Sequence, residues 1–218
     1  PLPTADFDRM TSTLAAAAAH APERLYEAKF RAAGRFMRGV KVRLAESSRP
    51  GWPVAEVRLE RQGERVRVPA TWFLQAWPVP QDAALAVDSN IATRWHAYGP
   101  APAGSFAEVL FDRPVPFDTL AVVSPMLARG GPAIEVFGLT MDRRWVRLAV
   151  AGPARALAPV PLRGQAMAFL KSRGIQWIVA PVGEIGHGPV GRSLMTYPNA
   201  WRVERVKQID GVWLFRLR

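Results

Sequence analysis

A glycine-rich stretch near the C-terminus gathers the residue types that acid–base chemistry uses. The segment 183–193 places Glu184 and His187 among glycines, with Arg192 and Ser193 behind them. A carboxylate and an imidazole can act as general acid and base. No second carboxylate at a defined spacing, no nucleophile elbow and no phosphate-loop spacing accompanies them. We therefore expect an ordered loop that packs on a parent protein or binds a phosphate-bearing donor, and no catalytic residue.

Cysteine is absent, which excludes a disulfide framework, a thiolate metal site and a thiol nucleophile without fixing the compartment. The chain starts at Pro1 and has no apolar run of about 18 residues that could span a bilayer. These features favour a soluble piece of a larger protein, with any membrane segment outside it.

The chain is strongly basic, with 29 Lys and Arg against 18 Asp and Glu and a formal charge of +11. Such a charge attracts polyanions. The charge indicates one of two things. Either the chain binds an anionic membrane or a nucleic acid, or GC-rich coding has produced an Arg-, Ala- and Pro-rich composition. Because the positive charges are scattered and not gathered in one run, we expect no specific nucleic-acid partner.

The hydrophobic pattern changes twice along the chain. Residues 4–20 have apolar side chains at helical spacing and many alanines, which predicts a helical connector over 1–24. From 25 to 160 the period is near two, as in Val40, Val42 and Leu44. Further strands are expected at 54–59, 64–68, 72–76, 107–111, 119–124, 134–139 and 145–150. Strands this short and frequent, with Pro and Gly between them, predict a mainly β fold, a β-sandwich.

The hydrophobic pattern of residues 161–218 differs from that of the preceding strands. A helix over 165–173 is followed by Gly174 and by a buried strand over 175–180. Strands at 202–208 and 212–217 flank Asp210-Gly211, a dipeptide that favours a hairpin turn because both positions want a positive φ. We expect a small C-terminal α/β module.

The segment 86–95, Ala-Val-Asp-Ser-Asn-Ile-Ala-Thr-Arg-Trp, resembles the Asp-Gly-Asn loop and Thr-Arg-Trp of discoidin or coagulation-factor type C domains. The later segments 106–118, 134–136 and 144–146 resemble that family's next strands. The pattern of that family's closing strands lies upstream of this segment, at 42–44, Trp52 and 55–59. This arrangement looks like a permuted strand order. A sandwich tolerates permutation when its first and last strands are neighbours. The resemblance implies a galactose-binding-like jelly roll.

The same resemblance implies a structural calcium ion held by oxygen atoms of Asp88, Asn90, Thr93 and Glu56. Permutation would still bring Glu56 to the loop, whereas Ser89 replaces the glycine that takes a positive φ. The alternative is that Asp88 simply caps its own turn.

Carbohydrate-binding relatives hold sugar at a rim of the sandwich, by an aromatic ring and a few polar groups. His96 and Tyr98 precede a Gly- and Pro-rich loop and are candidates, and so is Trp77, which could instead be a core anchor. Trp95 is expected in the core.

The permuted sandwich and its tail resemble the extracytoplasmic regions of bacterial membrane glycosyltransferases, in 170–179 and 211–217. The resemblance implies a non-catalytic, periplasmic or cell-surface accessory domain that meets a glycan or lipid-linked sugar and a parent membrane domain. The alternative is a basic docking module for an anionic membrane surface, polymer or partner protein.

Overall fold

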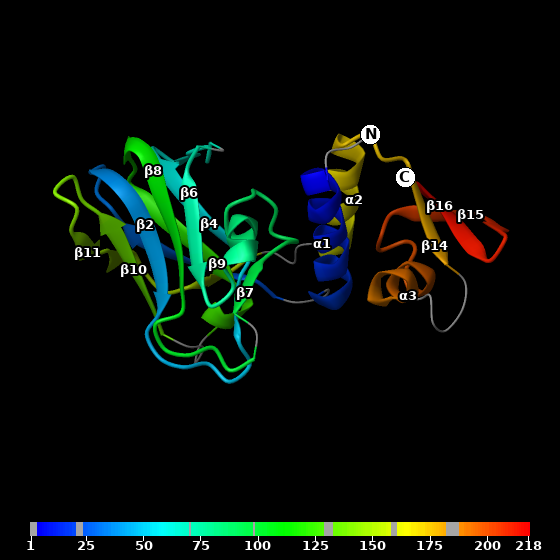
Figure 1. Cartoon of the computed structure of the whole chain (residues 1–218), viewed down its shortest axis with the longest axis horizontal. Coiled ribbons are helices and arrows are strands. Elements are labelled where there is room, and N and C mark those ends of the chain that lie inside the picture. The colour runs from blue at the N-terminus through cyan, green and yellow to red at the C-terminus, as the bar shows by residue number, and fades with distance from the viewer. Residues whose placement is uncertain are drawn as a thin grey trace. The chain divides into compact units, whose positions relative to one another are not determined.

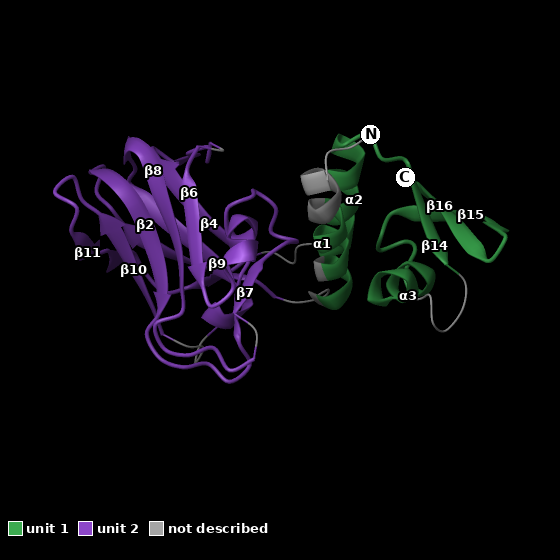
Figure 2. Cartoon of the chain, viewed as in Figure 1, with its two compact units in different colours: residues 1–23, 159–218 green, residues 24–158 purple. Residues whose placement is uncertain are grey.

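The computed structural model describes residues 4–20, 24–69, 71–97, 99–128, 133–157, 161–181 and 188–218. The chain forms two compact units, drawn in different colours in Figure 2. One consists of residues 24–158, and the other combines 1–23 with 159–218.

Two antiparallel sheets make up most of the 24–158 unit (Figure 1). The β1 sheet has the order β12-β1-β9-β4-β5, with β13 also on β1, and the β2 sheet has the order β11-β10-β2-β8-β6. The β1 sheet contains β1 (Tyr26–Arg31), β4 (Glu56–Arg61), β5 (Glu64–Arg65), β9 (Thr119–Ser124), β12 (Ala149–Val150) and β13 (Arg155–Ala156). The β2 sheet contains β2 (Phe36–Leu44), β6 (Phe73–Trp77), β8 (Phe106–Pro116), β10 (Ile134–Leu139) and β11 (Trp145–Arg147). The prediction of a mainly β fold is confirmed.

Both sheets contribute to one hydrophobic core. Val40 and Val42 from the β2 sheet and Leu120 and Val122 from the β1 sheet are buried in the same cluster. They sit at alternate positions, as a strand with one face in the core requires. The unit is completed by a short strand pair, β3 (Trp52–Val54) with β7 (Trp95–Ala97). It also contains two 3₁₀ turns, η1 (Pro80–Ala86) and η2 (Pro125–Leu127).

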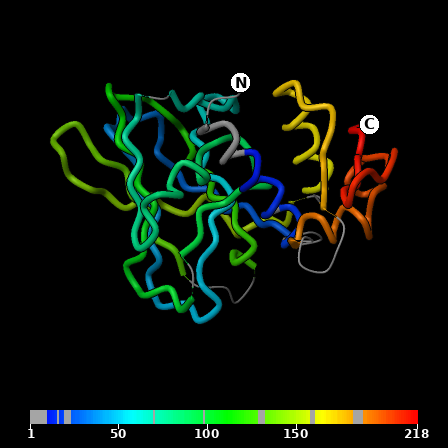
Figure 3. The backbone as a smooth tube through the Cα atoms, turned by 45° about the vertical axis from the view of Figure 1, so that its right-hand side comes forward, coloured from blue at the N-terminus to red at the C-terminus, as the bar shows by residue number. Residues whose placement is uncertain are grey.

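The segment predicted as one strand over 145–150 is divided between the two sheets. Residues 145–147 pair with β10 in the β2 sheet, and 149–150 pair with β1 in the β1 sheet. Leu148 is buried between the two stretches, and its amide donates to Val136 O at 2.8 Å. Figure 3 shows the path of the backbone from the N-terminus to the C-terminus. The prediction is therefore wrong in assigning the segment to one strand, because the buried Leu148 turns the chain from sheet to sheet.

The other unit contains α1 (Thr4–His20), α2 (Leu162–Ser172), α3 (Pro189–Thr196) and the antiparallel sheet β14-β16-β15. Its strands are β14 (Trp177–Pro181), β15 (Val203–Ile209) and β16 (Val212–Leu217). Asp210 and Gly211 both have a positive φ, 46° and 78°, which confirms the predicted turn. Within the described residues, no helix is long and apolar enough to span a membrane.

Helix α1 is not an isolated connector. Met10, Thr13 and Ala17 are buried at helical spacing, and the helix packs on α2 and α3. Helix α3 occupies part of the predicted 183–193 loop, because Pro189 begins a helix easily and Leu194 is buried.

Candidate functional site

The 88–93 segment is a turn tied together by its own side chains. Asp88 Oδ1 accepts from the amide of Asn90 at 2.9 Å, and Asn90 Oδ1 accepts from the amide of Ala92 at 3.1 Å. The Thr93 hydroxyl lies 2.8 Å from Asp88 Oδ2 and 2.7 Å from Asn90 O, and can donate to either. Ser89 has φ +68°, the left-handed conformation that glycine takes at smaller cost. Asp88 therefore caps its own turn, and Ser89 adopts a backbone geometry that favours glycine.

Glu56, on β4, lies close to this turn. Its side chain is fully buried, and Oε1 accepts from Arg65 Nη2 at 2.8 Å. Oε2 has no hydrogen-bond partner in the described part of the chain. Burial and, to a smaller extent, the charge of Asp88 raise the pKa of Glu56 to about 8, against the opposing charge of Arg65. Glu56 therefore lies within electrostatic range of Asp88.

These residues fit a hard cation in the kind of atoms they present. A cation would give Oε2 of Glu56 a partner and would relieve the repulsion between Glu56 and Asp88. No three or more His, Cys, Asp or Glu residues are grouped to hold a metal in the described ranges, so neutral oxygens of Asn90 and Thr93 would have to complete the set. Arg65 already supplies one positive charge to Glu56.

The predicted rim residues fall in different surroundings. His96 lies in strand β7 opposite Pro53, and a Cβ built on Gly51 would be 2.9 Å from its Nε2. Pairing of β7 with β3 half-buries the ring, ahead of the predicted Gly- and Pro-rich loop. Tyr98 lies outside the described residues. Trp77 ends strand β6 with its side chain exposed.

Trp95 is a core residue, as predicted. Its side chain is fully buried, and its indole N–H donates to Val79 O at 2.8 Å. Its ring packs edge-on against Trp52 at a centroid distance of 5.3 Å. In the other unit, Glu184 and His187 lie outside the described residues, and Ser193 is buried in α3, where its Oγ accepts from Trp201 Nε1 at 2.9 Å.

The outward face of the β2 sheet carries aromatic and polar side chains in rows across the strands. These side chains alternate with those in the core. We call this surface the aromatic face and define it by Trp77, Phe73, Phe106, Phe137 and Trp145 with Gln75, Glu108, Lys41 and Arg43. The register aligns Trp77 with Phe106 and Arg43, and Gln75 with Glu108, Lys41 and Phe137.

Cations hold several of these rings in place. Lys41 Nζ pairs with Glu108 Oε2 at 2.6 Å and lies 5.1 Å and 4.4 Å from the ring centroids of Phe106 and Trp145. The guanidinium of Arg43 lies 5.0 Å from the Phe137 ring. Such contacts fix ring orientation as well as adding attraction. Sequence reasoning found only Trp77, although the outward positions of the predicted strands 134–139 and 145–150 already included Phe137 and Trp145.

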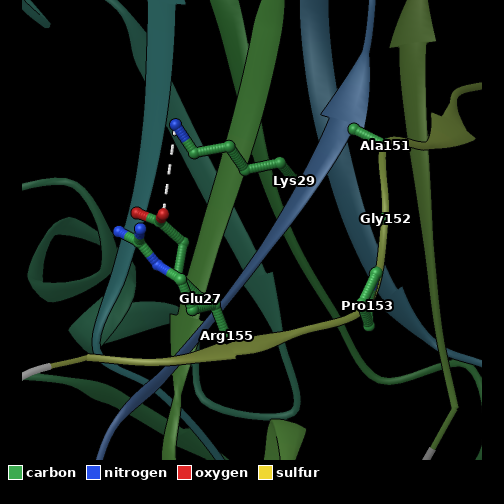
Figure 4. Close-up of a pocket in the computed structure, with 6 residues that line it drawn as sticks. All are labelled: Glu27, Lys29, Ala151, Gly152, Pro153 and Arg155. Atoms are coloured by element: carbon green, nitrogen blue, oxygen red, sulfur yellow. Dashed lines mark ion pairs between the residues drawn. The ribbon is translucent and has the colours of Figure 1, made fainter.

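A pocket of about 270 Å³ on the β1 sheet has a different character (Figure 4). It is lined by Glu27, Lys29, Ala151, Gly152, Pro153 and Arg155. Lys29 points toward Glu27 at 3.9 Å and pairs with Glu60 at 2.6 Å, so these charges largely neutralise one another. None of the described residues that line it is aromatic, which makes it a poorer sugar platform than the aromatic face.

Comparison with known proteins assigns no family. No protein-family model, no curated protein and no solved structure matches the chain.

Proposed function

We propose that residues 24–158 form a non-catalytic carbohydrate-binding module, which binds its glycan across the aromatic face. The observation that carries the proposal is the set of solvent-accessible rings interleaved with hydrogen-bonding side chains on one sheet. Aromatic faces stack on the apolar C–H surfaces of sugar rings, and polar neighbours fix the orientation of hydroxyls. Gln75 and the Lys41–Glu108 pair supply donors and acceptors beside Phe106.

The extent of the face fits an oligosaccharide. Trp77 lies on β6 and Trp145 on β11, at opposite edges of the sheet. Neighbouring strands lie about 4.8 Å apart, so the two edges are about 19 Å apart. A chain of several sugar rings could therefore contact both tryptophans.

The wider assignment is to a galactose-binding-like jelly roll with permuted strands, in an extracytoplasmic part of a membrane glycosyltransferase. The Asp88 turn beside Glu56 supports the fold type, because the permuted order requires that neighbourhood. The module would present a glycan or lipid-linked sugar to its parent membrane domain.

Glycan binding should depend on Trp77 and not on a similarly exposed tryptophan elsewhere. Trp77→Ala is expected to weaken binding about ten-fold, about 1.4 kcal/mol, because a stacking ring is lost. Trp177→Ala is the matched control, because Trp77 and Trp177 are both 45% exposed and Trp177 lies in the other unit. A glycan array followed by calorimetric titration measures both variants.

Salt distinguishes this function from attraction through surface charge. Binding by stacking and hydrogen bonds should persist at about 0.5 M salt, whereas attraction through arginines falls steeply there. Binding lost in salt, or lost equally in both variants, would overturn the glycan proposal and favour the docking module.

Calcium is proposed as a structural ion between the Asp88 turn and Glu56. Millimolar calcium should raise the melting temperature, because an ion that binds only the folded state stabilises it. The rise should disappear with chelator and in Asp88→Asn, while magnesium should substitute poorly because it demands a tighter octahedron. An equal rise in wild type and Asp88→Asn, measured by differential scanning calorimetry, would contradict this site.

A further inference from the structure

A second pocket in the 24–158 unit differs in chemistry from both the aromatic face and the β1-sheet pocket. Its volume is about 450 Å³. It lies where β2 begins and β4 and β8 end, and residues 66–69 and 71–72, which precede β6, complete it. Its lining is Phe36, Arg61, Val66, Arg67, Pro69, Trp72, Arg113, Pro114, Val115 and Pro116.

The charge of this pocket is positive and largely uncompensated. Arg61, Arg67 and Arg113 line it, no acidic residue does, and none of the three forms an ion pair within the described part of the chain. Glu64 is opposite Arg61 in the β4–β5 register without pairing with it.

Asp112, next to Arg113, is engaged elsewhere. Its Oδ2 accepts from the Thr71 hydroxyl at 2.7 Å, and its Oδ1 accepts from Trp72 Nε1 at 3.1 Å. The Thr71 hydrogen bond is the main cause that lowers the pKa of Asp112, with a smaller contribution from the charge of Arg113. The backbone amide of Arg113 also donates to Oδ1, at 2.8 Å. Three neutral donors thus hold the carboxylate, and the guanidinium of Arg113 retains donors for a ligand.

The walls of the pocket are apolar and stiff. Trp72 is 7% exposed and packs on Phe111 at a centroid distance of 4.2 Å, while Phe36 is 58% exposed. Pro69, Pro114 and Pro116 have fixed φ angles, so less backbone freedom is lost when a ligand binds. An exposed phenyl ring beside three guanidinium groups suits a ligand with one anionic and one apolar part.

We propose that this pocket binds an organic phosphate, with the phosphate oxygens on the arginines and an apolar substituent against Phe36. Guanidinium groups match phosphate oxygens in fork geometry and keep their charge at every physiological pH. The ligand is either a free phosphate ester or the headgroup of a phospholipid, which share this chemistry. The proposal is independent of glycan binding on the aromatic face.

The test uses hexyl phosphate, inorganic phosphate and vesicles of phosphatidylcholine with or without phosphatidic acid. Hexyl phosphate should bind more tightly than inorganic phosphate in calorimetric titrations, because the alkyl chain adds apolar contact. Arg67→Gln and Arg113→Gln should each weaken it about ten-fold, and Phe36→Ala should remove the advantage over inorganic phosphate. Arg31→Gln, an exposed arginine on β1 outside the pocket, removes the same charge and should change affinity less than two-fold.

Either source of the ligand has its own signature. Binding of hexyl phosphate without vesicle binding identifies a free ester, and vesicle binding that the pocket variants reduce identifies a lipid headgroup. Equal weakening by Arg31→Gln would show attraction by overall charge and overturn the pocket as the site. Failure of the wild-type protein to bind both hexyl phosphate and the vesicles with phosphatidic acid would also overturn it. Circular dichroism checks that each variant is folded.

Discussion

Replacing Trp95 by alanine is expected to lower the free energy of unfolding by about 3–5 kcal/mol. The side chain is fully buried, it packs edge-on against Trp52, and its indole N–H is hydrogen-bonded to Val79 O. Alanine would leave a large cavity beside Trp52 and an unpaired carbonyl on Val79. Urea denaturation followed by circular dichroism measures the loss.

Trp77→Ala is the comparison for this variant, because Trp77 lies on the surface at the end of β6. It should change stability by less than about 0.5 kcal/mol, as surface substitutions do, while it weakens glycan binding. If Trp95→Ala left stability unchanged, the assignment of Trp95 to the core would be wrong.

Stability should fall as pH rises through the neutral range, because of Glu56. Its pKa is raised to about 8 by burial and by the charge of Asp88, so the folded protein keeps a proton that the unfolded chain releases above about pH 4.5. The unfolded state then binds fewer protons between those values, and the free energy of unfolding declines by up to about 1.4 kcal/mol per pH unit. Below about pH 4.5 the contribution is constant.

Glu56→Gln should abolish this decline, because glutamine remains neutral at every pH. The variant should match wild type near pH 5 and exceed it near pH 8, in urea titrations with chelator present. Glu64→Gln, on the exposed strand β5, is the control and should keep the wild-type slope. Parallel slopes in wild type and Glu56→Gln would mean that Glu56 is not the group responsible.

Elements with a clean period could be predicted from the sequence. The helix over 4–20 and the strands over 119–124 and 134–139 have the predicted bounds. Strand β1 was not predicted, although its apolar residues alternate with Glu27 and Lys29 as in a half-buried strand. Both lie on the sheet face away from the core, where they also pair with Glu60 and Arg58 of the neighbouring strand β4.

The sites were less predictable, because they depend on contacts between distant segments. Asp88, Asn90 and Thr93 are local, and their turn could be predicted from their spacing. The half-buried position of His96 follows from pairing with residues 52–54, which nothing near His96 in the sequence indicates. The arginine pocket likewise joins Arg61 and Arg67 to Arg113 through the fold alone.

The division of residues 145–150 between the sheets has a consequence for how the sandwich opens. Trp145–Arg147 form the edge of the β2 sheet, and two residues later the same chain forms the edge of the β1 sheet beside β1. The amide of Ala151 continues this attachment by donating to Lys29 O at 2.7 Å. Detaching one edge therefore pulls on the other, so amide hydrogen exchange at the two edges reports a single cooperative opening and not two independent fraying events.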